Sequence, residues 1–351
     1  MKKILIVVPS LGPGGAELMA LNICRFLDKN KYCCLFVSLN ARENSINDIK
    51  ASNWGIEVVY LNKNKGFDFA IISKLRKIIK DFGPDVIHSH MNALLYAYLA
   101  KRKKVKHIHT VHCIPYGKKY YGYPVSLIKY IFSKKNVLPV SISNIQKQEI
   151  IRVFKLKNKS IPLIYNGIDI SLFDKPIEKD AKYIIDVGSF REIKNQIALI
   201  KGFYEISKIN DSICLLLIGD GPMKKKCEEL VDNLNIKDKV TFTGIVDDVQ
   251  NYLCKSLIYV STSKTEANPV TFLEAMAAGL PIISTNVGGV SDILGDGNGI
   301  LLDDDSPECI KVNVLFLLNN RELYDKISLN NRRTSLKYDI KKCCENYEQI
   351  Y

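Results

Sequence analysis

Short apolar runs alternate with helical patterns along the first half of the chain. The runs predict buried strands at residues 3–9, 33–39, 57–61, 85–88, 106–111 and 137–141. Apolar positions at helical spacing predict helices between them, at residues 17–27, 69–80, 93–100 and 144–153. Ser143 stands where its side chain would cap the last of these helices. Strands separated by helices of this length are typical of parallel β-α-β units.

A second series of the same kind begins near residue 183. Its strands are predicted at residues 183–187, 213–218, 240–243, 257–261 and 281–285. Its helices are predicted at residues 196–206, 223–233, 249–255, 270–278 and 306–318, and residues 322–351 are predicted to be helical. The 351 residues suffice for two domains that each bury a core. We therefore expect an α/β fold of two doubly wound, Rossmann-like domains, joined near residues 168–176. Ligands of such sheets bind beyond the carboxyl ends of the strands.

The stretch from residue 261 to residue 281 contains two acids around an Asn-Pro pair. Asn268 is a good N-cap, and Pro269 fits the first helical position because its missing N–H costs nothing there. Glu266 then lies on the loop before the helix, Glu274 lies about one turn inside it, and Gly279 ends it. Two carboxylates beside an anion-binding helix end suit a ligand that carries hydroxyls and phosphate together. The alternative is that both acids only complement the helix dipole.

Glycine-rich turns follow the first strand of each predicted domain. Gly14 and Gly15 belong to a Gly-Pro-Gly-Gly-Ala-Glu turn, where the backbone can approach a ligand; a tight strand–helix turn explains them equally well. This is not the spaced glycine pattern of dinucleotide binders, so a dehydrogenase is disfavoured. In the second domain Gly188 is followed by Arg191 and Lys194, two cations that could neutralise a departing diphosphate.

The five histidines all lie between residues 88 and 112. His90 and His112 follow strands at the end where parallel sheets place their active sites, whereas we expect structural roles for His88, His107 and His109. No third ligand converges with them in the sequence, and no cysteine pair has zinc-site spacing, so no metal site is predicted.

The string from Glu266 through the Gly-x-Pro stop to the next apolar strand closely resembles the signature of the retaining glycosyltransferases of family 4. That family has the GT-B fold, in which two Rossmann-like domains face each other across a cleft. The resemblance implies that Glu266 holds the donor sugar and Glu274 the ribose of the nucleotide. It also implies domains at residues 1–168, which bind acceptor, and 169–335, which bind the nucleotide sugar, with a last helix at 336–351 crossing back to the first domain.

Further motifs extend the resemblance over most of the chain. His112 matches the histidine that touches the donor hexose, and Lys194 keeps the place of the family's lysine. Ser189 stands where the family has arginine, so Arg191 is expected to take over, and Ala267 replaces a glycine. The remaining donor-binding residues implied by the resemblance are Gly14, Gly15, Asn166, Gly188, Gly219, Pro269, Val270 and Gly288.

The resemblance implies a retaining glycosyltransferase that needs no metal or other cofactor. We expect it to move a hexose or N-acetylhexosamine from a UDP- or GDP-sugar to a lipid-linked saccharide or a surface polysaccharide, as in lipopolysaccharide or capsule synthesis. A nucleotide-sugar 2-epimerase of the same fold is the alternative within the enzymes. A nucleic-acid binder is a weaker alternative, because no nucleic-acid motif accompanies the basic charge.

The charge is distributed unevenly. Through Lys175 there are 29 Lys or Arg and 11 Asp or Glu, and between Val86 and Gln148 there is no acid at all. Such a field concentrates anions, among them an acidic membrane surface or a diphosphate acceptor. Residues 118–135 interleave tyrosine, aliphatic residues and lysine, which suits either a bilayer interface or a buried helix with a basic exposed side.

We expect the protein to be cytoplasmic and peripheral at the inner face of the cell membrane. The ten cysteines are scattered, which fits a reducing compartment. The apolar start of the chain ends at Pro9 and reads as a first strand rather than a signal peptide, and no apolar stretch is long enough to span a bilayer.

Overall fold

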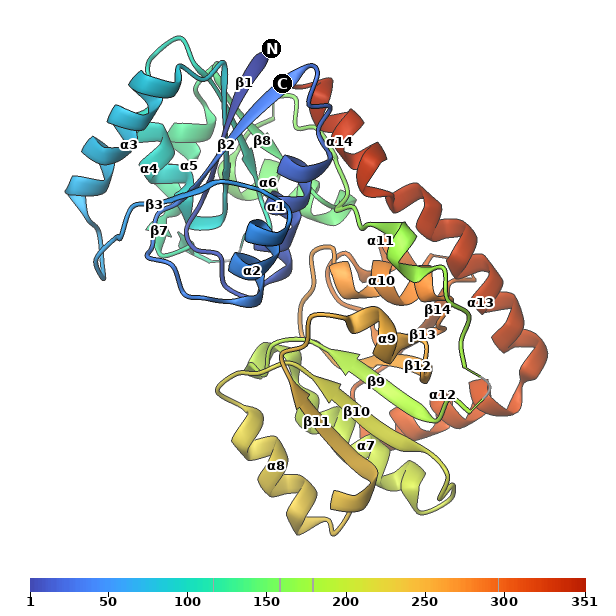
Figure 1. Cartoon of the computed structure of the whole chain (residues 1–351). Helices are drawn as coiled ribbons and strands as arrows, with labels where there is room; N and C mark the ends of the chain where they lie inside the picture. The colour runs from blue at the N-terminus through green and yellow to red at the C-terminus, as the bar shows by residue number, and fades with distance from the viewer. Residues whose placement is uncertain (116, 158, 179, 296) are drawn as a thin grey trace. The chain divides into compact units, whose positions relative to one another are not determined.

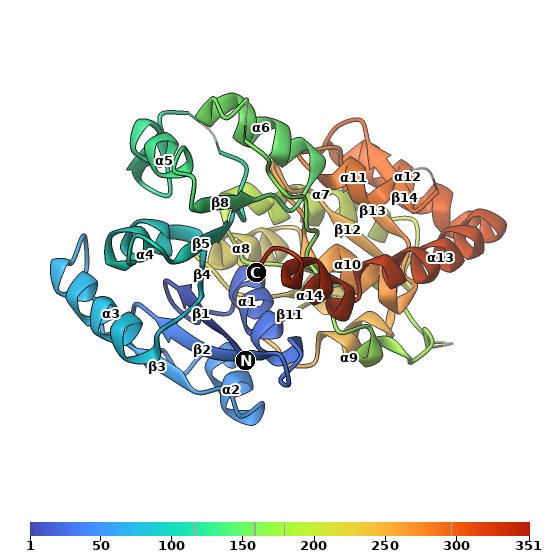
Figure 2. The same ribbon diagram turned by 90° about the horizontal axis from the view of Figure 1, so that it is seen from above.

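The computed structural model describes residues 1–115, 117–157, 159–178, 180–295 and 297–351. These residues form two compact units (Figures 1 and 2). Unit 1 comprises Met1–Gly167 together with Ile340–Tyr351, and unit 2 comprises Ile168–Asp339. Within the described ranges, no helix combines the length and the apolar character that crossing a membrane requires.

Unit 1 is built on a six-stranded parallel sheet in the order β3-β2-β1-β4-β5-β8. The strands are β1 (Lys2–Val8), β2 (Tyr32–Ser38), β3 (Val58–Tyr60), β4 (Val86–His90), β5 (Lys106–Thr110) and β8 (Val137–Val140). The helices are α1 (Gly15–Phe26), α2 (Ile46–Asn53), α3 (Phe69–Phe82), α4 (Leu94–Ala100), α5 (Val125–Phe132), α6 (Asn144–Phe154) and α14 (Ile340–Glu348). A small hairpin, β6 (Lys119–Tyr120) and β7 (Tyr123–Pro124), precedes α5.

Unit 2 repeats this plan with the parallel order β11-β10-β9-β12-β13-β14. Its strands are β9 (Tyr183–Val187), β10 (Cys214–Ile218), β11 (Val240–Gly244), β12 (Ser256–Ser261), β13 (Ile282–Thr285) and β14 (Gly299–Leu302). Its helices are α7 (Gln196–Ser207), α8 (Lys224–Asn233), α9 (Val249–Leu253), α10 (Val270–Ala278), α11 (Val290–Leu294), α12 (Pro307–Asn319) and α13 (Arg321–Ser335). The strand order reverses beside the first strand of each unit, which defines a doubly wound, Rossmann-like α/β fold.

Every strand predicted from the apolar runs is present, because a parallel sheet covered by helices needs strands that are apolar on both faces. In β1, Ile4 and Ile6 pack into a core that includes α1, whereas Leu5 and Val7 pack into a separate core that includes α3 and α4. The strands β6, β7 and β14 and the helices α2 and α11 were not predicted; all of them are short, although α2 begins at a capping box formed by Ser45 and Asp48.

Residues 118–135 contain a helix with one buried side. Ile128, Ile131 and Phe132 of α5 are fully buried in the core of unit 1, while Tyr130 is 54% exposed with Lys134 over its ring. This agrees with the interpretation as a buried helix with a basic exposed side.

The segment from residue 322 to residue 351 is largely helical, as predicted, but it is divided into two helices. A short 3-10 turn at Leu336–Tyr338 separates α13 from α14. The backbone N–H of Ile168 donates to the carbonyl of Tyr338 at 2.9 Å, and Ile168 forms a β-bridge with Asp339. This pairing with a residue far away in sequence interrupts the helix, and no local signal announces it.

The last helix, α14, packs beside α1 of unit 1 (Figures 1 and 2). The rings of Tyr347 and Tyr351 are buried in the core of that unit. The Tyr347 hydroxyl lies 2.8 Å from Oγ1 of Thr110, and the Tyr351 hydroxyl lies 2.8 Å from Nδ1 of His88. Both rings therefore fasten the C-terminal segment to β4 and β5 through polar contacts as well as packing.

We predict that Tyr347→Ala destabilises unit 1 by roughly 3–5 kcal/mol, because a buried ring is lost and a cavity remains. The chain has a single tryptophan, Trp54, which lies in unit 1, so its fluorescence during urea unfolding reports on that unit. Gln349→Ala is the control, since Gln349 is exposed on the same segment. Equal unfolding midpoints for both variants would contradict the anchoring role.

Candidate active site

The predicted site residues lie where parallel sheets place their ligands, beyond the carboxyl ends of strands. In unit 1, Gly14 and Gly15 follow β1 and His112 follows β5, while Asn166 is buried near the end of the unit. In unit 2, the turns after β9, β10, β12 and β13 carry Gly188, Arg191, Lys194, Gly219, Glu266 and Gly288, and α10 carries Val270 and Glu274.

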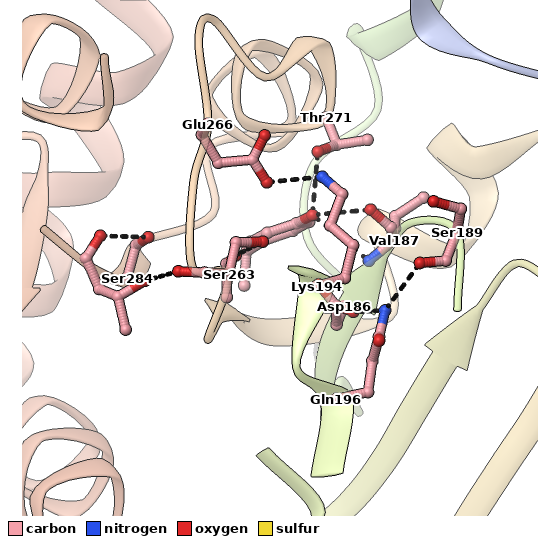
Figure 3. Close-up of polar contacts among 12 residues, drawn as sticks. Asp186, Val187, Ser189, Lys194, Gln196, Ser263, Glu266, Thr271 and Ser284 are labelled. Atoms are coloured by element: carbon pink, nitrogen blue, oxygen red, sulfur yellow. Dashed lines mark hydrogen bonds and ion pairs between the residues drawn. The ribbon is translucent and has the colours of Figure 1, made fainter. Parts of the chain in front are cut away.

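The centre of the arrangement in unit 2 is an ion pair between Lys194 and Glu266 (Figure 3). Nζ of Lys194 donates to Oε1 of Glu266 at 2.5 Å, and the two side chains are 25% and 11% exposed. The loops that carry them are joined by the backbone as well, because the N–H of Lys264 donates to the carbonyl of Ile193 at 2.8 Å. The structure thus brings two sequence-predicted residues, 72 positions apart, into direct contact.

A buried carboxyl group lies next to this ion pair. Asp186 is the fourth residue of β9, and its Oδ2 accepts a hydrogen bond from Nε2 of Gln196 at 3.3 Å (Figure 3). Burial raises the pKa of Asp186 to about 7, against the opposing effects of the Lys194 charge and of the Gln196 hydrogen bond. Among the described residues, no partner accompanies the buried Oε1 of Gln196. A protonated Asp186 could donate to that oxygen.

The start of α10 is tied to the end of β9 through a buried tyrosine. The hydroxyl of Tyr259 donates to the carbonyl of Val187 at 3.1 Å and lies 3.0 Å from Oγ1 of Thr271. Helix α10 begins at Val270, and Pro269 occupies its cap position without a side-chain cap hydrogen bond. The N-cap was predicted at Asn268 and the first helical position at Pro269; the structure has the cap position at Pro269, one residue later.

The far end of α10 is held by an arginine. Gly279 has the left-handed backbone (φ 80°) that ends the helix, as predicted. Nη2 of Arg332 donates to the carbonyl of Ala278 at 2.8 Å, and the Arg332 side chain fills the space that a Cβ at Gly279 would need. Both ends of the helix that carries Glu274 are thereby fixed.

Glycines let neighbouring turns approach each other closely. A Cβ on Gly219, whose φ is 130°, would lie 2.1 Å from the carbonyl oxygen of Gly188, so these two turns pack backbone against backbone. The turn at Gly288 is connected to the acid loop, because the N–H of Gly289 donates to the carbonyl of Glu266 at 2.8 Å.

Arg191 lies apart from these contacts. Its side chain is exposed and makes no hydrogen bond or ion pair with another described residue. Ser189, which occupies the slot where an arginine was expected, is also exposed, and its carbonyl accepts from Nε2 of Gln196 at 3.4 Å.

In unit 1 the glycine turn is held by the N-terminal end of α2 and its cap residue Ser45. Nδ2 of Asn47 donates to the carbonyl of Gly12 at 2.6 Å, and the Ser45 hydroxyl donates to the carbonyl of Leu11. Gly14 precedes α1 with extended backbone, and the carboxylate of Glu17 folds back to within 2.2 Å of where a Cβ of Gly14 would lie. The glycine therefore leaves room for the Glu17 side chain.

The histidines form two groups at β4 and β5. His88 and His90 lie together, and Nδ1 of His90 is 2.8 Å from Nε2 of His112. His107 and His109 both contact the hydroxyl of Ser89 instead, at 2.8 and 2.9 Å. Burial lowers the pKa of His112 to about 4 and that of His90 well below its ordinary value, so both imidazoles are neutral near pH 7.

Sequence reasoning missed Asp186, Gln196 and Tyr259. The available signal was an acid and a tyrosine inside otherwise apolar strands, where a polar group needs a specific partner. Within the described ranges, no group of three or more His, Cys, Asp or Glu side chains is arranged so that it could hold a metal ion.

Comparison with known proteins agrees with this description. Residues 168–334 match the sequence model of the glycosyl transferases group 1, and residues 13–172 match that of glycosyltransferase family 4. The chain is 31% identical over 285 residues to an uncharacterized glycosyltransferase of Methanocaldococcus jannaschii, covering 74% of this chain and 72% of the relative. It is 28% identical over 305 residues to the N-acetyl-alpha-D-glucosaminyl L-malate synthase of Bacillus anthracis, covering 81% and 79%.

Among solved structures, Anabaena HepE in complex with UDP and glucose superimposes with a TM-score of 0.86 at 18% identity, covering 100% of this chain and 99% of that one. The chain belongs to the group 1 glycosyltransferases of family 4, and its two Rossmann-like units are those of the GT-B fold.

The raised pKa of Asp186 predicts a specific dependence of stability on pH. The folded value is about 7 and the ordinary value is 3.8, so the folded state binds the proton more tightly than the unfolded state. Stability is therefore lost as the pH rises from about 4 through about 7, by roughly 4 kcal/mol at most. Asp186→Asn, which cannot ionise, should flatten this part of the profile in chemical unfolding between pH 5 and pH 8. An unchanged slope would show that Asp186 titrates normally.

Proposed function

We propose that this glycosyltransferase moves a hexose or N-acetylhexosamine from a UDP- or GDP-sugar, with retention of configuration, to a lipid-linked saccharide or surface polysaccharide. The observation that carries the proposal is the Lys194–Glu266 pair beside the start of α10. HepE, which has the same fold, was solved with UDP and glucose, and the B. anthracis relative is named for an N-acetyl-alpha-D-glucosaminyl product.

The ion pair keeps both charges of the proposed donor site paired when no donor is bound. Without donor, each charge satisfies the other, which avoids leaving a half-buried charge unpaired. A nucleotide sugar supplies replacement partners for both, since its hydroxyls donate to the carboxylate of Glu266 and its diphosphate accepts from Lys194. Binding then exchanges one set of charge-assisted contacts for another instead of stripping ions of water.

Departure of the diphosphate is the step that these residues assist. Negative charge grows on the leaving group as the glycosidic bond breaks, and a fixed cation at hydrogen-bond distance stabilises that charge. Lys194 is the principal cation in this proposal, and the exposed Arg191 adds a second one. Glu266 and His112 hold the hexose, so that catalysis rests on orientation and leaving-group electrostatics without a covalent nucleophile or a metal.

The remaining residues hold the nucleotide. Glu274 is proposed to bind the ribose hydroxyls from α10, next to the backbone of Pro269 and Val270 at the helix start. Glycine turns allow phosphates and base to approach the backbone without side-chain obstruction. Those turns contain Gly14, Gly15, Gly188, Gly219 and Gly288, and Asn166 adds a polar group near the end of unit 1.

The first test is a screen of donors. UDP-glucose, UDP-N-acetylglucosamine and GDP-mannose are compared in thermal shift, since a ligand that binds the folded state raises its stability by mass action. The donor with the largest shift is then incubated with a bacterial lipid extract, and both free nucleotide and glycolipid are measured. Conversion of the donor to an epimer without transfer would identify a 2-epimerase and refute the proposal.

We predict that Lys194→Ala and Glu266→Ala each lower the transfer rate by roughly a hundredfold or more, because each removes a charge that is already in place. The matched control is the surface pair Lys208 and Glu205, 2.8 Å apart at the C-terminal end of α7 in the same unit. Lys208→Ala and Glu205→Ala should leave transfer unchanged. Loss of activity in the control, or retention in the site variants, would remove the ion pair from the mechanism.

We also propose that unit 1 contacts an anionic membrane at the inner face of the cell membrane, through the lysines around α5. Replacing Lys118, Lys119, Lys134 and Lys135 by Glu should abolish flotation with vesicles of acidic phospholipid. The control replaces four lysines of unit 2, namely Lys201, Lys225, Lys226 and Lys237. Equal flotation of both quadruple variants would discard this surface.

A further inference from the structure

Two imidazoles at the end of β4 and β5 are directly bonded to each other. His90 is the last residue of β4 and pairs in register with Thr110, the last residue of β5, and His112 follows two positions later. Nδ1 of His90 lies 2.8 Å from Nε2 of His112, and the ring centroids are 5.1 Å apart with an angle of 28° between the ring planes. On its other side the His90 ring lies against His88, with centroids 4.2 Å apart. The plane of His90 is thus fixed between two other rings.

The hydrogen bond can run in only two directions, since both rings are neutral and one nitrogen of each carries a proton. If His112 donates, the proton of His90 must lie on Nε2. That atom is buried and has no partner among the described residues, so an N–H would be left unsatisfied. If His90 donates, its Nε2 carries only a lone pair. An orphaned buried N–H is rarer in proteins than an unfilled acceptor, which favours His90 as the donor.

The direction of this bond determines what His112 can offer. When His90 donates to Nε2, the single proton of His112 lies on Nδ1. No other described residue bonds to Nδ1, and the His112 side chain is only half-buried. That N–H is therefore available to an oxygen of a ligand.

We propose that His90 is a positioning residue: it donates from Nδ1 to Nε2 of His112, fixing the Nδ1–H tautomer and the ring plane of His112 so that His112 acts as a hydrogen-bond donor to a sugar hydroxyl. This inference rests on the proposed function, in which His112 touches the donor hexose. His88, on the same strand as His90, differs from it because both of its ring nitrogens have hydrogen-bond partners, the hydroxyls of Tyr351 and Thr110.

The tautomer is measured directly in the free protein. With ¹⁵N-labelled histidine, long-range proton–nitrogen correlation spectra distinguish a protonated Nδ1 from a protonated Nε2, and His112→Gln assigns the signal. We expect Nδ1–H for His112 in the wild type and in His90→Asn, whose amide N–H can occupy the position of Nδ1. In His90→Leu the signal should move towards the Nε2–H form that free histidine prefers. A wild-type His112 protonated on Nε2 would overturn the proposal.

Kinetics then connects the tautomer to function, with UDP-glucose as the probe and UDP release as the readout. His90→Leu should lower kcat/KM by roughly tenfold or more, whereas His90→Asn should stay within about threefold of the wild type. His107→Leu is the matched control, because His107 is equally buried, makes one hydrogen bond to Ser89 and also has one nitrogen without a described partner. It should lose similar thermal stability and keep its activity.

The outcomes separate this inference from the function on which it rests. If the wild type releases nucleotide and His90→Leu is no slower than His107→Leu, His90 has only a structural role. If the wild type releases nucleotide from none of the three sugars of the donor screen, the proposed function fails, and the spectra of the free protein still decide the tautomer.

Discussion

The candidate site of unit 2 depends on one electrostatic constraint, which is that Lys194 and Glu266 must both keep their charge while they are largely removed from water. At 25% and 11% exposure neither charge is well solvated alone, so each requires the other or a ligand. Asp186 is buried next to this ion pair, and if it were ionised it would add a second negative charge without a second cation. Burial raises the pKa of Asp186, so that the neutral form of this carboxyl group is favoured over a third buried charge.

Such a pair is useful only if both partners return to the same place after each exchange with ligand. The rest of unit 2 supplies that rigidity from outside the loops themselves. Tyr259 links the end of β9 to the start of α10, and Arg332 closes the other end of that helix. The backbone contact between Gly188 and Gly219 brings the turns after β9 and β10 together. Each contact comes from a different strand or helix, so the loops that carry Lys194 and Glu266 are held in place by the sheet and its helices.

The fold was predictable because its main signal is local. A parallel sheet covered on both faces requires strands that are largely apolar, and the run at 183–187 gave the bounds of β9. The bounds of α10 came from Pro269 before the helix and Gly279 after it. The motif residues were also found at the carboxyl ends of the strands, and the contact between Lys194 and Glu266 follows from that placement. What the sequence could not reveal were features that depend on register and distant pairing. The break between α13 and α14 arises from Ile168, and the contact of His90 with His112 arises from how β4 pairs with β5.

The two units solve the problem of buried polar groups in opposite ways, and the difference suits the partners proposed for them. Unit 2 holds ions, which bind a doubly charged diphosphate by exchange of counter-charges. At β4 and β5, unit 1 instead buries neutral rings and hydroxyls, with His88 bonded to Tyr351 and Thr110 and His90 to His112. A neutral network carries no net charge, and under the proposed function it would select a sugar hydroxyl by the position of a single N–H. In such a network the location of one proton determines which groups can donate, so the lack of a partner for Nε2 of His90 among the described residues bears on the proposed function.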